Sequence, residues 1–180
     1  MIYYNFSGGA LGSDSKWDII GRKYGFENHI HFYHGNKTPL GNLELTDEEC
    51  DEGWIHVLKA NETLKRKPDN FKSLLSRNWY QVKMSDGIFA ISSLVKNSKR
   101  LVSGGTGWAV QMAIDNNKYV YVFDQELNKW FQYNYAYGEF SECEMPTLTN
   151  NFAGIGTREI NKNGENAIEE VYKKTKDLSK

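Results

Sequence analysis

The sequence predicts an α/β fold in which a mainly parallel sheet carries helices on both faces and ends in a small antiparallel hairpin. Three observations support this prediction. Three glycine-rich turns each stand between a strand-like and a helix-like segment, an order that is typical of parallel sheets. The strongest strand-like segments are short and apolar, as interior parallel strands should be. Residues 129–140 crowd aromatic side chains around one glycine and indicate a hairpin.

The first half of the chain begins with an apolar strand and continues through helices with recognisable ends. Asp14 is placed to cap the helix after the first glycine turn, and Gly25 ends that helix. Residues 29–34 alternate as a strand does. Thr46 and Glu49 have the spacing of a capping box, which opens a helix. The elements expected here are strands at 2–6 and 29–34 and helices at 15–24, 47–65 and 70–77.

The second half contains the clearest strands. Residues 87–92 form a short, continuous apolar run, which is typical of a buried parallel strand. Residues 119–124 alternate as Tyr-Val-Tyr-Val-Phe-Asp. An apolar stripe around Ile168 marks the last helix. The elements expected here are strands at 87–92, 100–103, 119–124 and 151–155, helices at 108–115 and 162–176, and the hairpin at 129–140.

Length and charge restrict the class of protein. The chain has 180 residues, of which 39% are hydrophobic and 25% charged, so we expect one globular domain over residues 1–180. Lysine and arginine total 22 against 23 aspartates and glutamates, which gives a formal net charge of -1. A non-specific nucleic-acid binder needs a basic face. The charge balance therefore argues against nucleic acid as a partner.

The cysteines and the amino-terminal residues indicate a compartment. Cys50 and Cys143 lack CxxC spacing, and free thiols in a reducing cytosol are the simpler interpretation. Residues 1–6 have neither the basic region nor the long apolar run of a signal peptide. No stretch is long and apolar enough to span a membrane. We therefore expect a cytoplasmic protein with no membrane partner.

The three glycine turns are the main candidates for a ligand site. They cover residues 7–14, 103–108 and 152–158. Glycine lets backbone N–H groups approach a phosphate closely, and a helix that starts after the turn adds its positive end. Because parallel strands carry their ligand loops at one edge, the turns should line one pocket. No turn matches GxxxxGK[ST] or GxGxxG with an acidic partner, which argues against a P-loop kinase or an ordinary NAD-dependent dehydrogenase.

The combination of these turns resembles a known family. Residues 103–111 are similar to the PGGxGTxxE signature of the lonely-guy (LOG) phosphoribohydrolases. These enzymes belong to the SLOG superfamily of Rossmann-like domains, which also contains the DNA-processing protein DprA. Residues 7–14 resemble the other glycine turn of the superfamily, and Arg77 with residues 85–90 resembles its conserved arginine and next core strand. Residues 156–158 resemble its G-[ST]-R turn.

The order of these motifs departs from the family pattern. The G-[ST]-R turn normally opens such domains, whereas here Gly156-Thr157-Arg158 comes last. The resemblance therefore implies a circularly permuted domain, which is tolerable because domain termini often lie close together. Under this interpretation, the strand at 151–155 should lie in the interior of the sheet, beside the strand at 2–6.

The resemblance implies a nucleotide-derived ligand, either ADP-ribose-like or a cyclic nucleotide signal, with no cofactor and a homo-oligomeric state. SLOG domains also act as receptors for nucleotide-derived signals in bacterial immunity. A small version would be a bacterial or phage protein that sequesters such a signal, which is an anti-defence role. The residues expected to bind the ligand are Gly8, Gly9, Ala10, Gly12, Asp14, Lys37, Arg77, Gly104, Gly105, Thr106, Gly107, Trp108, Gln111, Gly156, Thr157 and Arg158.

A departure at Gln111 favours a binding protein over an enzyme. The matching glutamate of the phosphoribohydrolases is catalytic, since a carboxylate stabilises the positive charge that develops on the ribose. Gln111 carries no charge, so no catalytic residue is assigned. The alternative is a nucleoside-monophosphate phosphoribohydrolase or related N-glycosidase that uses Arg77, Asp14 and Gln111. It requires that Asp14, Asp86 or Glu159 substitute for the missing glutamate. A DprA-like single-strand DNA-binding protein is the other alternative, and the near-neutral charge argues against it.

Three histidines raise the question of a metal site. On a strand, His29 and His31 share one face, and His34 does not. No acidic residue stands at a typical metal spacing. We therefore expect no bound metal and place these histidines at the surface or on the rim of the pocket.

Some polar and aromatic residues leave two interpretations open. Lys37 either meets a phosphate or belongs to a solvent-exposed loop. Trp108 is the expected stacking partner for a base, because it lies in the second glycine turn. In the hairpin, Trp130, Tyr133 and Tyr135 either stack on a purine or, as we favour, pack on the sheet or form a subunit interface.

Overall fold

The computed structural model describes residues 1–179, which form an eight-stranded sheet in the order β3-β2-β1-β8-β4-β5-β6-β7. The six strands from β3 to β5 in this order are parallel, and β6 and β7 are antiparallel to their neighbours. The strands are β1 (Tyr4–Ser7), β2 (Asn28–Tyr33), β3 (Leu43–Glu44), β4 (Gly87–Ser92), β5 (Tyr119–Asp124), β6 (Lys129–Asn134), β7 (Glu139–Cys143) and β8 (Asn151–Gly156).

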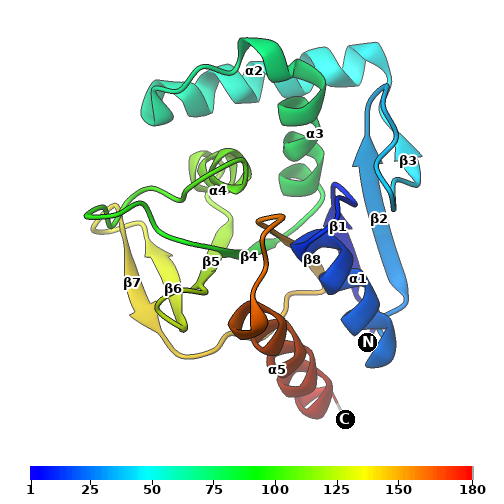
Figure 1. The fold of residues 1–180 in the computed structure, drawn as a ribbon, viewed down its shortest axis with the longest axis vertical. Coiled ribbons are helices and arrows are strands. Elements are labelled where there is room, and N and C mark those ends of the chain that lie inside the picture. The colour runs from blue at the N-terminus through cyan, green and yellow to red at the C-terminus, as the bar shows by residue number, and fades with distance from the viewer. Residues whose placement is uncertain (180) are drawn as a thin grey trace.

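Helices cover both faces of this sheet (Figure 1). On one face lie α2, α3 and α4, and on the other lie α1 and α5. The helices are α1 (Ser13–Lys23), α2 (Asp47–Leu64), α3 (Lys72–Lys83), α4 (Thr106–Asp115) and α5 (Lys162–Leu178), with a short 3-10 turn, η1 (Asp69–Phe71), before α3. The predicted fold class is therefore confirmed: the protein is a Rossmann-like α/β fold with a mainly parallel sheet.

The alternating side chains of β4 divide the apolar core into two layers. Ile88 and Ala90 pack in the cluster that includes α2, α3 and α4, whereas Phe89 and Ile91 pack with Trp17 and the α5 side chains. Successive residues of a strand point to opposite faces. A strand that is buried at every position, as β4 is, must therefore be covered on both sides.

Most of the expected elements are confirmed within a few residues. The strands at 87–92 and 119–124 have the expected bounds. The capping box is present: Thr46 Oγ1 accepts a hydrogen bond from the Glu49 N–H, and the Glu49 carboxylate accepts one from the Thr46 N–H. The hairpin is also confirmed, since β6 and β7 form the antiparallel edge of the sheet. Strand β3, which is only two residues long, was not expected.

The capping role expected for Asp14 is wrong. Gly12 precedes α1 with a φ of 96°, and no side chain caps this helix. Asp14 lies inside the first turn of α1, where its Oδ2 accepts hydrogen bonds from the N–H groups of Gly8 and Ala10 at 3.1 and 3.4 Å. The turn folds back over the helix start, so the carboxylate stabilises the glycine turn instead of the helix end.

Two other expectations need correction. The helix expected at 70–77 continues to Lys83, because the aromatic side chains of Trp79 and Tyr80 are buried against neighbouring elements. Packing of this kind overrides the weaker helix propensity of aromatic residues. The strand expected at 100–103 is reduced to one isolated bridge between Leu94 and Val102.

The expected positions of the first and last strands are confirmed. β8 lies between β1 and β4, and β1 lies between β2 and β8, so both are interior strands. The chain thus returns to the middle of the sheet after its antiparallel edge. Among the helices of residues 1–179, none has an apolar stretch long enough to cross a membrane.

Candidate functional site

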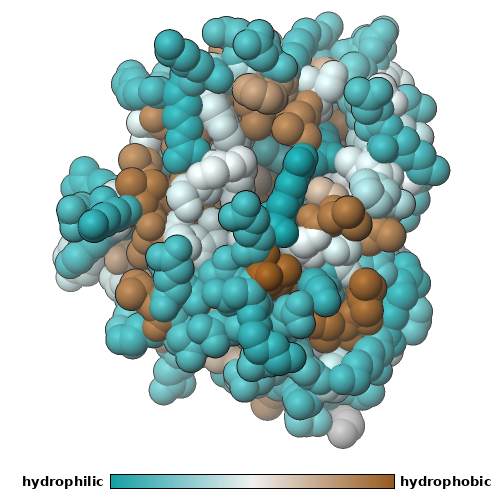
Figure 2. All heavy atoms as spheres, viewed as in Figure 1, coloured by the Kyte–Doolittle hydropathy of each residue, from teal (hydrophilic) through white to brown (hydrophobic). Residues whose placement is uncertain are grey.

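A cavity of about 450 Å³ opens at the carboxyl ends of β4 and β8, between α3 and α4. Its volume falls within the range of small-molecule sites. All three glycine turns contribute to its lining, through Ala10, residues 104–106 and residues 156–158. The turns therefore line one cavity, as the sequence predicts. Figure 2, viewed as in Figure 1, shows pale residues of intermediate hydropathy near the centre of this face, next to both hydrophilic and hydrophobic residues.

The first and third turns interlock beside this cavity. The N–H and hydroxyl of Ser13 both donate to the Thr157 carbonyl oxygen, at 3.0 and 2.6 Å. A side chain at Gly12 would collide with the backbone of Arg158. In Figure 1 the segment after β8 crosses in front of the sheet next to the start of α1. Segments some 144 residues apart in sequence therefore form one wall.

Arg77 is the buried cation of the cavity. It comes from α3, is 7% exposed and lines the cavity. Its Nη1 donates to the Gly8 carbonyl at 3.0 Å, while its Nε has no hydrogen-bond partner. A side chain at Gly8 would force Arg77 to shift, because a Cβ there would lie 2.7 Å from the Arg77 Cζ. Burial lowers the pKa of Arg77, an effect that Asp14 opposes and Arg158 reinforces, yet an arginine remains charged at neutral pH.

Asp14 faces the same space but does not form an ion pair with Arg77. The two residues have no N–O contact within 4.0 Å among the ion pairs of residues 1–179. Burial raises the pKa of Asp14, while Arg77 and the N–H groups of Ala10 and Gly8 favour its charged form. The cavity thus holds an arginine and a carboxyl group that do not neutralise each other by direct contact.

The second turn presents backbone N–H groups at the start of α4. Gly104 has a φ of 65°, and there is open space beside Gly104 and Gly105. Within residues 1–179, the N–H groups of Gly105 and Thr106 have no hydrogen-bond partner. Free N–H groups at a helix start attract anions. Arg66 holds the turn in place, because its guanidinium donates hydrogen bonds to the carbonyl oxygens of Gly104 and Val102, both at 2.8 Å.

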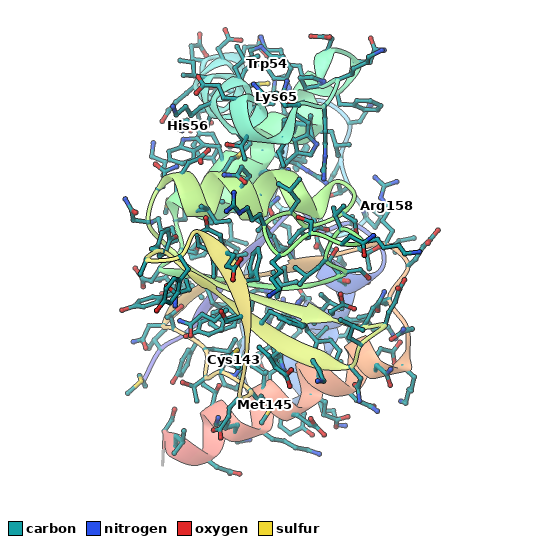
Figure 3. All side chains as sticks on the ribbon, turned by 90° about the vertical axis from the view of Figure 1, so that its left-hand side faces the viewer. Trp54, His56, Lys65, Cys143, Met145 and Arg158 are labelled. Atoms are coloured by element: carbon teal, nitrogen blue, oxygen red, sulfur yellow. The ribbon has the colours of Figure 1, made fainter. Side chains whose placement is uncertain are left out.

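The third turn supplies the outer rim. Thr157, Arg158 and Glu159 line the cavity, and Arg158 is exposed. Figure 3 shows the Arg158 side chain at the outer edge of the molecule, projecting toward solvent. The Arg158 guanidinium therefore stays in solvent, and from the rim it can contact a ligand in the cavity.

Several expected ligand-binding residues shape the turns without lining the cavity. Gly9 approaches the Cβ of His31 and the backbone of Leu40 too closely for a side chain. The loop after β2 supports the first turn, since Thr38 Oγ1 donates to the Gly8 carbonyl at 2.7 Å. Of the expected residues, the cavity lining does not include Gly8, Gly9, Gly12, Lys37, Gly107, Trp108 or Gln111.

Trp108 and Gln111 face away from the cavity. Trp108 is 5% exposed and packs in the apolar core. The Gln111 side chain donates to the Asp115 carboxylate at 2.9 Å, along α4 itself. Successive side chains of a helix point in directions about 100° apart around its axis. Ala109 therefore reaches the cavity, whereas its neighbour Trp108 does not. Lys37 is exposed outside the cavity.

Apart from Arg77, the wall formed by α3 was not expected from the sequence. Its lining residues recur at positions one helical turn apart, which places them on one face. Because the expected helix ended at residue 77, the pattern was cut short. The residues of this wall are Leu74, Leu75, Arg77, Asn78 and Gln81.

The histidines differ from the expectation that they are exposed or at the pocket rim. His29 and His31 are buried, and α1 brings Asp18 to them, which no sequence spacing shows. His31 Nε2 lies 2.7 Å from the Asp18 Oδ2, and His31 Nδ1 lies 2.6 Å from Ser7 Oγ. His34 instead contacts Asp47, the first residue of α2, with 2.8 Å between its Nε2 and Asp47 Oδ1.

The potential metal-ligating atoms of Asp18, His29 and His31 lie within 4.8 Å of one another, close enough to share a metal ion. Their hydrogen bonds fit a protein network better. The Asn5 side-chain oxygen accepts from the Gly154 N–H, so its NH₂ group faces His29 Nδ1 at 3.0 Å. The Asn5 NH₂ group therefore donates to His29 Nδ1, the ring nitrogen that a metal ion in this cluster would have to use. Burial lowers the pKa of His29, although the Asp18 carboxylate opposes this, and a neutral ring suits this network.

Comparisons of the chain with protein-family models, with curated proteins and with solved structures find no significant match. The chemistry of the cavity is therefore the basis for assigning a function. The fold and the site define an α/β protein with a cavity at the carboxyl ends of its parallel strands, lined by two arginines, two carboxyl groups and the glycine turns.

Proposed function

We propose that this protein binds a nucleotide-derived small molecule, of the ADP-ribose or cyclic-nucleotide type, with a phosphate held among the three glycine turns. The observation that carries the proposal is the buried Arg77, whose Nε has no partner and whose charge has no ion-pair partner within the cavity. A buried guanidinium is costly unless an anion completes its hydrogen bonds. A phosphate is suited to this task because it accepts paired N–H bonds from arginine.

The neighbouring groups support the same ligand. The free N–H groups of Gly105 and Thr106 add the positive end of α4. Arg158 stands at the rim, where a second phosphate oxygen would meet it. Asp14 and Glu159 balance the two arginines of the lining, so the cavity has no large excess of positive charge. This balance favours one or two phosphates over a triphosphate chain.

The biological setting of this proposal rests on the SLOG resemblance. By that resemblance, the protein is a cytoplasmic homo-oligomer from a bacterium or phage, and it sequesters a nucleotide-derived immune signal. Retention of a small molecule without turnover is the activity that such a role requires.

Mass spectrometry of small molecules released from the purified, denatured protein tests the proposal directly. We expect a phosphorylated nucleoside derivative, and titration calorimetry with ADP-ribose, AMP and cyclic AMP should then give saturable binding. Lys37→Ala is the matched control, because Lys37 is an exposed cation near the first turn that does not line the cavity. Binding that is lost in this control, or absent from the unaltered protein, would contradict the proposal.

An N-glycosidase is a second candidate, and the position of Asp14 favours it. Gln111 does not line the cavity, whereas the Asp14 carboxyl group does and its pKa is raised by burial. A carboxylate near the ribose stabilises the charge that develops when the glycosidic bond breaks, and a carboxylic acid can protonate the leaving base. Incubation with AMP and measurement of free adenine separates this enzyme from a binding protein. Turnover that disappears in Asp14→Asn would support the enzyme.

A further inference from the structure

The α3 wall of the cavity carries two amide side chains in contact. Asn78 and Gln81 lie one helical turn apart, and both line the cavity. Gln81 Nε2 donates a hydrogen bond to Asn78 Oδ1 at 3.3 Å. This bond orients the two amides relative to each other.

The contact leaves hydrogen-bonding groups unused. Within residues 1–179, no hydrogen bond is formed by Gln81 Oε1 or by Asn78 Nδ2. Gln81 is only 3% exposed, so bulk water reaches little of it. If both amides were turned over, Asn78 would donate to Gln81, and one acceptor and one donor would again remain free. Either orientation therefore presents a neighbouring donor and acceptor to the cavity.

Gln81 lies in a buried part of the cavity lining. It is 3% exposed, whereas Leu74, at the other end of the α3 wall, is 38% exposed and Asn78 is partly exposed. The glycine turn at residues 104–105 is exposed and belongs to the open end. Ala109 and Ile155 add apolar surface to the lining. Apolar walls with a few fixed polar groups are typical of sites for flat organic ligands.

We propose that Asn78 and Gln81 form a base-recognition subsite that binds the hydrogen-bonding edge of a purine nucleobase. This inference rests on the proposed function, because it places the base of the same ligand whose phosphate meets Arg77. Amide side chains recognise adenine through its amino group and an adjacent ring nitrogen. Guanine offers a similar pair at N1–H and O6. The chemistry that the subsite requires is therefore a donor beside an acceptor on a planar ring.

Binding measurements with four probes test the subsite: AMP, GMP, purine riboside 5′-monophosphate and ribose 5-phosphate. Purine riboside lacks the exocyclic group, and ribose 5-phosphate lacks the base. We expect AMP or GMP to bind at least about tenfold more tightly than purine riboside monophosphate, the scale of one paired amide–base contact. Which of AMP and GMP binds more tightly identifies the base.

The variant Gln81→Met should remove this preference while ribose 5-phosphate affinity stays within about twofold. Gln132→Met is the matched control, because Gln132 lies on β6 outside the cavity. Asn78→Asp provides a second test: it keeps the acceptor for Gln81 and removes the free donor, so it should also abolish the preference. Thermal melting of each variant shows whether it is folded.

Two results would overturn the subsite without affecting the proposed function. In the first, Gln81→Met and Asn78→Asp both keep the preference for AMP or GMP. In the second, folded variants lose affinity equally for ribose 5-phosphate, which would show a general change in the cavity. Absence of binding by all four probes to the unaltered protein would overturn the subsite, and absence of binding by ADP-ribose and cyclic AMP as well would also overturn the proposed function.

Discussion

Arg77 and Arg158 act on the cavity in different ways because one is buried and the other is not. Arg77 is held by the Gly8 carbonyl and faces inward with an unpartnered Nε. Arg158 reaches the cavity from an exposed turn. Replacement of Arg77 would disturb both folding and binding, whereas replacement of Arg158 reports on binding alone. Arg158 is therefore the better residue for a test of the phosphate contact.

We predict that Arg158→Ala weakens ligand binding by about 1.5–3 kcal/mol, the scale of a hydrogen bond to a charged group. The free energy of unfolding should hardly change, since the side chain is exposed. Calorimetric titration of the ligand identified by mass spectrometry gives the affinity, and urea denaturation gives the stability. An affinity equal to that of the unaltered protein would remove Arg158 from the site.

At the scale of single elements, helix ends and helix pairs depend on a few polar contacts. The capping box holds the start of α2 through reciprocal bonds between Thr46 and Glu49. On the opposite face, the Glu169 carboxylate of α5 accepts from Lys23 Nζ at 2.7 Å and from the Tyr24 hydroxyl at 2.6 Å. This contact joins α5 to the end of α1. Both contacts give predictions that do not depend on any ligand.

Thr46→Ala should lower the free energy of unfolding by about 1 kcal/mol, because it leaves the Glu49 N–H without its cap. Thr147→Ala is the control: Thr147 is exposed and caps no helix. Urea denaturation of both variants checks the prediction. Equal stability of the two variants would show that the capping box contributes little to α2.

The pH dependence of stability should report on Glu169. Hydrogen bonds from Lys23 and Tyr24 lower the pKa of Glu169 from 4.5 to about 2. A carboxyl group whose pKa is lower in the folded state stabilises the fold above its unfolded pKa, and this contribution is lost as the pH falls. Between pH 4.5 and about 2, the unaltered protein should therefore lose more stability than Glu169→Gln. Parallel stability curves from urea denaturation would contradict this.

At the scale of the whole molecule, the cavity depends on turns that are distant in sequence. The first turn, the third turn and the α3 wall meet only because β8 inserts between β1 and β4. Gly12 lies at the point where the first and third turns come closest. The buried network of Asp18, His31 and Ser7 supports the same region, since Ser7 Oγ accepts from the Gly9 N–H at 3.2 Å.

Gly12→Ala should destabilise the protein by about 1–3 kcal/mol and also weaken ligand binding, because the new Cβ would force the first and third turns apart. Gly25→Ala is a matched control. Both glycines have a positive φ, 96° and 89°, but no atom lies within 4 Å of a Cβ at Gly25. The control should share the backbone strain and keep full affinity. A similar loss of affinity in both variants would show that the interlocked turns are not needed for binding.

Local patterns determined most of the secondary structure. The apolar run of β4, the alternation of β5 and the capping box of α2 each depend on residues close in sequence. The sequence also indicated that the glycine turns share one edge of the sheet, because the turns that follow parallel strands all lie at the carboxyl ends of those strands. Where burial overrode local preference, as in the extension of α3 to Lys83, the sequence was insufficient.

The sequence by itself determined the fold class, the glycine turns and the presence of Arg77 and Arg158 beside them. Only the tertiary structure decided which side chains face the cavity. A rotation of about 100° per residue separates Ala109 from Trp108, and only the packing of α4 on the sheet fixes which of them points inward. Likewise, Asp18 on α1 meets His31 on β2, although 13 residues separate them in sequence. Contacts between elements depend on how those elements pack, and spacing along the chain does not encode that packing.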